Sequence, residues 1–266
     1  MLKKNALNTF LIFAFTLVAF KSQQVSQKKF PIKSDFIAVD NIGNLYAVKD
    51  NELIKYSSTG KMFARYSDLK LGNISHVDVT NPLKILLYYR DYQQIVFLDN
   101  QLSLNSQNVS LEKLGFEQSE LVCSGANNSF WIYDKQNNEL LRFNENSKKI
   151  AATGNLKQVL KIEINPNYML EHNGLLFLNC PDSGIYVFDM FGAYVKVISL
   201  KNLSNFQSTE NILYFNRDSS LCSYHYKQFE ESCQKIHQPK GYKQVLYLNK
   251  HMYLTYKDSV VVLPIN

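Results

Sequence analysis

Six aspartates recur along the chain, each in a short polar stretch between two apolar ones. Successive spacings of 41, 43, 48, 36 and 40 residues separate Asp50, Asp91, Asp134, Asp182, Asp218 and Asp258. Carboxylates gathered on one surface could bind a cation, but an aspartate in a tight hairpin also hydrogen-bonds its own turn and tolerates the dihedral angles needed there. Basic neighbours such as Lys49, Arg90 and Arg217 partly neutralise the set. We interpret the six as structural turn residues and expect no metal site.

Catalytic motifs give little support for an enzyme. The five histidines have no HxxxH or HExxH spacing, and the chain has neither a G-x-S-x-G elbow nor a glycine-rich phosphate loop. They are His76, His172, His225, His237 and His251. His76, in the stretch His76-Val77-Asp78, could serve as a base, although a satisfied polar residue of an inner strand is the simpler interpretation. We therefore predict no catalytic set and no cofactor.

The four cysteines contain one suggestive pair. Cys222 and Cys233 flank a polar stretch, and a hairpin there would place their sulfurs opposite each other. A disulfide and two free thiols on neighbouring strands both fit this arrangement. Cys123 and Cys180 lie in apolar stretches and are expected to be buried. No CxxC motif supports a zinc site.

The elements that carry these residues form a repeat of about forty residues. Each unit has an apolar strand, a turn that holds one of the aspartates, and a second apolar strand. The strand pairs are residues 44–56, 84–97, 129–143, 175–188, 212–224 and 252–262. Flanking stretches such as 36–40 and 76–80 supply an inner strand, and stretches such as 61–66 and 193–199 supply an outer one.

Six units of four short strands predict an all-β fold, a single six-bladed β-propeller over residues 23–266. The sixth unit ends at Pro264-Ile265-Asn266 without an outer strand of its own. A spare strand-like segment, Val25 to Ile32, precedes the first unit. We expect it to complete the last blade and close the ring, the alternative being a frayed tail.

Two stretches carry a family pattern of the form D-x-x-G-N-I-Y-V, an Asp, then I-x-V-F-D-x-x-G. They are Val39 to Val48 with Asp50 and Ile54, and Gly184 to Asp189 with Gly192 and Tyr194. In these residues the chain resembles the NHL-like and TolB-like six-bladed propellers. The resemblance implies the propeller fold over the whole mature chain. Lactonase, lyase and glutaminyl cyclase relatives place catalytic groups around the central channel, so it also leaves an enzyme as an alternative.

The rim turns of such a ring carry mixed Lys, Arg, Asp and Tyr side chains. Arg90 and Tyr92 flank the aspartate of the second unit, and Arg217 precedes that of the fifth. Exposed tyrosine and arginine side chains are typical anchors of protein interfaces. We predict that Arg90, Tyr92 and Arg217 bind a protein partner.

The N-terminus has the features of a secretory signal peptide, which we place at residues 1–22. Lys3 and Lys4 precede the apolar run LIFAFTLVAF, which is too short to span a membrane. Of the 29 basic residues three lie in this part, so 26 remain against 23 acidic ones. This balance gives no reason to expect nucleic acid as a partner. We expect a periplasmic or secreted protein that is not an integral membrane protein.

These features together predict a non-enzymatic propeller that binds a protein. In size and address the chain is also similar to small soluble propellers that associate with the outer-membrane translocon of the type 9 secretion system. That similarity implies a protein-transport role in an outer-membrane complex. A small-ligand or glycan sensor and a lactonase-like or lyase-like enzyme remain alternatives.

Overall fold

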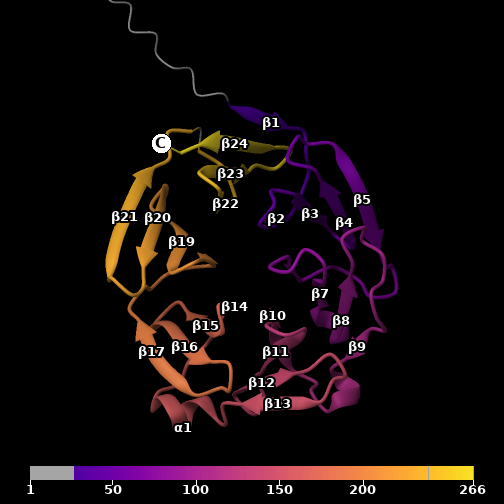
Figure 1. Cartoon of the computed structure of the whole chain (residues 1–266), viewed down its shortest axis with the longest axis vertical. Helices are drawn as coiled ribbons and strands as arrows, with labels where there is room; N and C mark the ends of the chain where they lie inside the picture. The colour runs from indigo at the N-terminus through magenta and orange to yellow at the C-terminus, as the bar shows by residue number, and fades with distance from the viewer. Residues whose placement is uncertain (1–26, 239, 266) are drawn as a thin grey trace, which may run out of the picture.

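The computed structural model describes residues 27–238 and 240–265, which form a ring of six four-stranded antiparallel sheets around a central channel (Figure 1). The predicted all-β, six-bladed propeller is confirmed. The predicted signal peptide, residues 1–22, lies outside the described residues. No helix among the described residues is long and apolar enough to cross a membrane.

Each of the first five blades uses four consecutive strands, from the channel outward. Blade one has β2 (Phe36–Val39), β3 (Leu45–Lys49), β4 (Glu52–Tyr56) and β5 (Met62–Ser67). Blade two has β6 (His76–Asp78), β7 (Ile85–Tyr89), β8 (Gln94–Leu98) and β9 (Val109–Ser110). Blade three has β10 (Ser119–Gly125), β11 (Ser129–Asp134), β12 (Glu139–Phe143) and β13 (Lys149–Ala152).

The second half of the ring repeats this order. Blade four has β14 (Tyr168–His172), β15 (Leu175–Cys180), β16 (Gly184–Asp189) and β17 (Tyr194–Ile198). Blade five has β18 (Gln207–Thr209), β19 (Ile212–Arg217), β20 (Ser220–His225) and β21 (Glu230–Lys235). Blade six has β22 (Gln244–Leu248), β23 (His251–Thr255) and β24 (Val260–Pro264). Three short helical segments, which the sequence analysis did not predict, lie in connections: the 3₁₀ turns η1 (Arg90–Tyr92) and η2 (Glu112–Leu114), and α1 (Leu156–Leu160).

The outer strand of blade six comes from the other end of the chain. Strand β1 (Lys28–Phe30) pairs antiparallel with β24, with Lys28 opposite Val262 and Phe30 opposite Val260. This confirms the predicted closure, although Val25 and Ser26 of the predicted segment lie outside the described residues. Phe30 also packs against the turn of blade one, because a Cβ added at Gly60 would lie 2.2 Å from its ring. The segment thus joins the last blade to the first.

Six apolar clusters hold the ring together, one between each pair of neighbouring blades. In the cluster between blades one and two, Tyr46 and Leu53 pack with Val77 and Leu87. The other five follow the same arrangement around the ring. The aromatic side chains counted in the sequence mainly fill these wedges, where bulky rings cover the space that widens between flat sheets.

Turns after the third strand use a polar cap rather than glycine alone. In blade four, Asp189 Oδ1 accepts hydrogen bonds from the backbone N–H of Phe191 and of Ala193. Asp99 in blade two and Asn144 in blade three accept in the same way. These side chains replace the missing backbone partners of the turn, which is why the polar clusters of the sequence marked the strand boundaries.

The cysteine pair lies where the hairpin predicted it. Cys222 of β20 is paired in register with Cys233 of β21, and the structure joins them in a disulfide. Among the described residues, the one grouping with metal-ligand spacing is these two sulfurs with Glu231, and the disulfide occupies both sulfurs. Cys123 and Cys180 are buried thiols.

Deleting residues 25–32 should lower the melting temperature and promote self-association, because β24 would become an exposed apolar edge. Thermal melting and light scattering of the mature chain measure both effects. The double substitution Lys28→Ala with Lys29→Ala keeps the backbone ladder and should behave as wild type. An unchanged melt and a clean monomer after the deletion would show that β1 does not close the ring.

The disulfide should stabilise blade five without being needed for the ring. It spans a sequence separation of 11 residues, and closing so short a loop contributes about 2 to 3 kcal/mol in the chain-entropy model. Alkylation of unreduced, denatured protein followed by intact-mass measurement should label two thiols, and four labels would mean that the bridge is absent. Urea unfolding of the variant with Cys222→Ser and Cys233→Ser measures its stabilising effect.

Candidate functional site

The central channel is the main hollow of the ring and holds a cavity of ≈ 700 Å³. Residues from all six innermost strands, β2, β6, β10, β14, β18 and β22, contribute to its wall, and Figure 1 shows these strands around the centre of the ring. A cavity of this volume is in the range of sites for small organic ligands. One end opens on the face that carries the turns between the second and third strands of each blade, which we call the turn face. Asp35, Arg90, Glu120 and Lys243 border that end.

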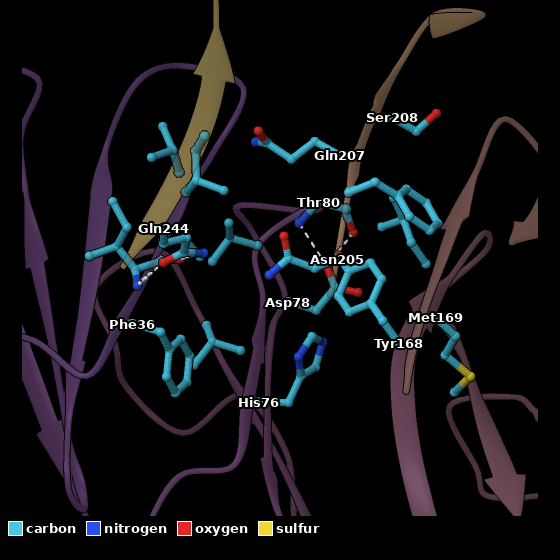
Figure 2. Close-up of a pocket in the computed structure, with 18 of the residues that line it drawn as sticks. Phe36, His76, Asp78, Thr80, Tyr168, Met169, Asn205, Gln207, Ser208 and Gln244 are labelled. Carbon is cyan, nitrogen blue, oxygen red and sulfur yellow. Dashed lines mark hydrogen bonds between the residues drawn. The ribbon is translucent and has the colours of Figure 1, made fainter. Parts of the chain in front are cut away.

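Just inside the turn face, aromatic side chains meet in the channel. The rings of His76 and Tyr168 make an edge contact with their centroids 6.1 Å apart, and Tyr168 makes a second edge contact with Phe206 at 5.3 Å. Figure 2 shows His76, Tyr168 and Asn205 turned into the space between the blades. Each comes from the beginning of an innermost strand or the residues directly before it.

Burial sets the protonation of these rings. It lowers the pKa of His76 below its usual value of 6.5, the Arg90 guanidinium lowers this pKa further, and the Asp78 carboxylate opposes both effects in part. Burial also raises the pKa of the Tyr168 hydroxyl, and Asp78 adds to that shift. At neutral pH the channel therefore presents a neutral imidazole beside a protonated phenol.

The buried carboxylates near the channel accept hydrogen bonds that hold neighbouring segments of the scaffold together. Asp78 Oδ1 accepts from the backbone N–H of Thr80 at 2.9 Å and from its hydroxyl at 2.6 Å, and Oδ2 accepts from Ser124 N–H at 2.8 Å. Glu171 accepts from Ala126 N–H and from the Trp131 indole at 2.5 Å, and it lies 3.9 Å from the Arg142 guanidinium. Carboxylates bound in this way are poorly placed to act as a general base or as metal ligands.

Of the three predicted partner-binding residues, the structure brings two together. Arg90 and Tyr92 share the 3₁₀ turn η1 of blade two, and Tyr92 is 53% exposed, whereas the neighbouring Tyr88 and Tyr89 are buried. Arg217 lies on blade five, across the ring. Its guanidinium pairs with Glu231 at 2.5 Å and lies over the Phe215 ring.

The six turn aspartates lie on the turn face but differ in their contacts. Asp134 is buried, and its carboxylate accepts from Gln136 N–H and from the Asn137 amide. Asp50 and Asp218 adopt left-handed backbone conformations, with φ of 52° and 48°. The remaining three, Asp91, Asp182 and Asp258, are exposed. The six turn aspartates are therefore of three kinds: one is buried and hydrogen-bonded within its turn, two have a left-handed backbone, and three are exposed.

The sequence analysis missed several channel residues that the repeat could have found. Tyr168 begins β14 and Phe36 begins β2, at the position that His76 holds in β6. Aligning the inner strands as carefully as the hairpins would have placed the three rings at one level. Lys243 had no such signal, because it directly precedes β22 in an otherwise polar connection.

Comparisons with known proteins agree on the fold alone. No family model matches the chain, and no curated protein does. Among solved structures it is similar to an inactive virginiamycin B lyase from Staphylococcus aureus crystallised with quinupristin, with a TM-score of 0.57, 11% identity, and coverage of 86% of this chain and 80% of that one.

Two other similar structures are a WD40 domain and a protein in complex with a partner. The Pan2 WD40 domain of Neurospora crassa has a TM-score of 0.58 at 10% identity, over 87% of this chain and 89% of that one. The protein BBS1N, in complex with ARL6DN, has a TM-score of 0.52 at 8% identity, over 84% and 75%. At such identities the matches establish a propeller and leave its function open.

The lowered pKa of His76 predicts a pH dependence of stability. As pH falls through 6.5 the unfolded chain gains a proton at this residue while the folded protein does not, so stability falls by at most about 1.4 kcal/mol per pH unit. His76→Gln should remove this part of the acid destabilisation, and His237→Gln, an exposed control, should retain it. Urea midpoints at pH 8 and pH 5.5 measure the difference. Equal losses in wild type and His76→Gln would contradict the assignment.

Proposed function

We propose that the protein is a non-catalytic binding protein of the cell envelope or exterior, and that it captures a partner protein on the turn face of blade two. The observation that carries this proposal is the exposed group around η1. Tyr92 packs over Gly72, in the same loop as Leu69, whose side chain is 85% exposed. No hydrogen bond or ion pair joins the Arg90 guanidinium to another described residue. We call Leu69, Arg90 and Tyr92 the blade-two patch.

The composition of the blade-two patch favours a protein partner. The aromatic ring, the arginine and the aliphatic side chain can be buried in an interface without breaking an existing ion pair, so the cost of burial is low. Tyrosine and arginine also dominate interface energetics. Two other basic residues on the turn face are already paired, Lys49 with Asp35 at 2.9 Å and Lys135 with Glu120 at 2.6 Å. For the same reason Arg217 is no longer part of the proposed surface.

The protein-binding proposal also agrees with two of the fold relatives, a WD40 domain and a propeller solved in complex with another protein. The predicted signal peptide supports a location in the periplasm or outside the cell. An outer-membrane assembly, such as a type 9 secretion translocon, is the partner class that the address and size favour.

A lyase-like enzyme is the second candidate, favoured by one observation. His76 is neutral, and no hydrogen bond joins its ring to another described residue, so a nitrogen is free to accept a proton from a ligand in the channel. The similarity in fold to a virginiamycin B lyase supports the same idea. Incubation with quinupristin, followed by mass spectrometry, tests it: conversion that is lost in His76→Gln would establish an enzyme.

Replacing Arg90 and Tyr92 together by Ala should weaken partner capture at least tenfold while changing stability by no more than about 0.5 kcal/mol, because both side chains are exposed. The matched control is Arg65→Ala with Phe191→Ala, which removes an exposed arginine and a 72% exposed aromatic elsewhere. Immobilised variants are compared for the proteins they retain from an envelope extract of the producing cells. Equal retention by both double variants would contradict the blade-two patch.

A further inference from the structure

The channel has an apolar and aromatic wall just inside the turn face. Phe36 of β2 and Tyr168 of β14 both line the cavity there, with Leu121 and Leu246 contributing aliphatic surface. The edge contacts of Tyr168 with His76 and Phe206 fix the orientation of its ring. A planar apolar group would bury its faces against such rigid rings with little loss of side-chain freedom.

Inside this wall the channel offers neutral hydrogen-bonding groups rather than free charge. The Asp78 carboxylate is saturated by Thr80 and Ser124. Ser208 also lines the cavity, but its buried hydroxyl points away from the channel (Figure 2). A ligand body that lies inside the channel should therefore be uncharged.

At the turn-face end the charge balance is different. Asp35 and Glu120 border the opening, and each is held by a lysine outside it, Lys49 and Lys135. Arg90 and Lys243 border the same opening, and no hydrogen bond or ion pair joins either side-chain cation to another described residue. The opening thus carries two cations without a hydrogen-bonded partner, and Lys243 lies close enough to Asp35 to help lower the pKa of that carboxyl.

We propose that the channel binds an aromatic carboxylate, with its ring against Phe36 and Tyr168 and its carboxylate at Arg90 and Lys243. A free aromatic acid and the C-terminal aromatic residue of a peptide share this chemistry. The site shares only Arg90 with the blade-two patch. Its other residues are not part of that patch, so the proposal does not depend on the partner that the patch binds.

Two probes of equal size test the charge. They are 3-phenylpropionate and its neutral amide 3-phenylpropionamide, each titrated into the full mature protein by calorimetry. The acid should bind at least tenfold more tightly than the amide. Lys243→Gln should reduce that preference severalfold, and Lys257→Gln, which changes a rim lysine outside the channel, should leave it intact.

A second variant separates the ring from the charge. Tyr168→Leu should weaken the acid and the amide by the same factor, because it removes stacking surface but no cation. A free aromatic acid and a peptide C-terminus are distinguished with a peptide that ends in Tyr, tested with a free and with an amidated C-terminus. Tighter binding of the peptide with the free C-terminus than of 3-phenylpropionate indicates a chain terminus. Equal affinity of acid and amide, or no binding of any probe, would overturn the proposal.

Failure here can be told apart from failure of the proposed function. Tyr92→Ala should weaken partner capture and leave probe affinity unchanged, because Tyr92 does not line the cavity. Lys243→Gln should do the reverse. If Tyr92→Ala lowered probe affinity as much as Lys243→Gln, the assignment of the ligand to the channel would be wrong.

Discussion

Every innermost strand of the ring has one edge with no neighbouring strand, and those edges must find hydrogen-bond partners around the channel. Unpaired backbone groups are costly when buried, so a propeller with a narrow channel depends on side chains to satisfy them. Here Gln244 of β22 accepts from Ile37 N–H at 2.9 Å and donates to Ile37 C=O at 3.0 Å. Gln207 of β18 accepts from Tyr247 N–H in the same way. Each bond connects the inner edges of two neighbouring blades.

The same requirement explains why the buried charges belong to the scaffold. Asp78 reaches from blade two to the edge of blade three, and Glu171 reaches back from blade four to the same strand end. Farther out, cations continue the pattern: Lys55 donates to Asn100 C=O at 2.7 Å and Arg142 to Met190 C=O at 2.9 Å, each on the next blade. Both residues directly precede the last residue of a third strand, Tyr56 or Phe143. Replacing one partner of such a buried set would leave the other buried without a partner, which is strongly destabilising.

Sequence reasoning predicted the features that repeat. The spacing of the turn aspartates and the alternation of apolar strands established the blade number, and the missing sixth outer strand established the role of Lys28–Phe30. The cross-strand position of Cys222 and Cys233 followed from the hairpin register. Alignment of the inner strands could place His76 and Tyr168 at one level, but not predict that their rings touch, because the two residues are far apart in the chain and meet only through the closed ring. Nor could the sequence show that Arg217 is paired with Glu231, thirteen residues after the turn aspartate.

Side chains that make no hydrogen bond or ion pair within the scaffold indicate function better than the residue types alone do. Aspartate and glutamate are the residues that a reader of the sequence would examine first, yet Asp78 and Glu171 are committed to backbone and indole donors. A carboxylate whose oxygens already accept several hydrogen bonds has few lone pairs left for a substrate or a metal. The groups that remain available are exposed Tyr92 with Arg90 and, in the channel, neutral rings near an opening that the same Arg90 and Lys243 border. Such a set supplies shape and charge without a committed acid–base pair, and this is the physical basis on which we propose binding rather than catalysis.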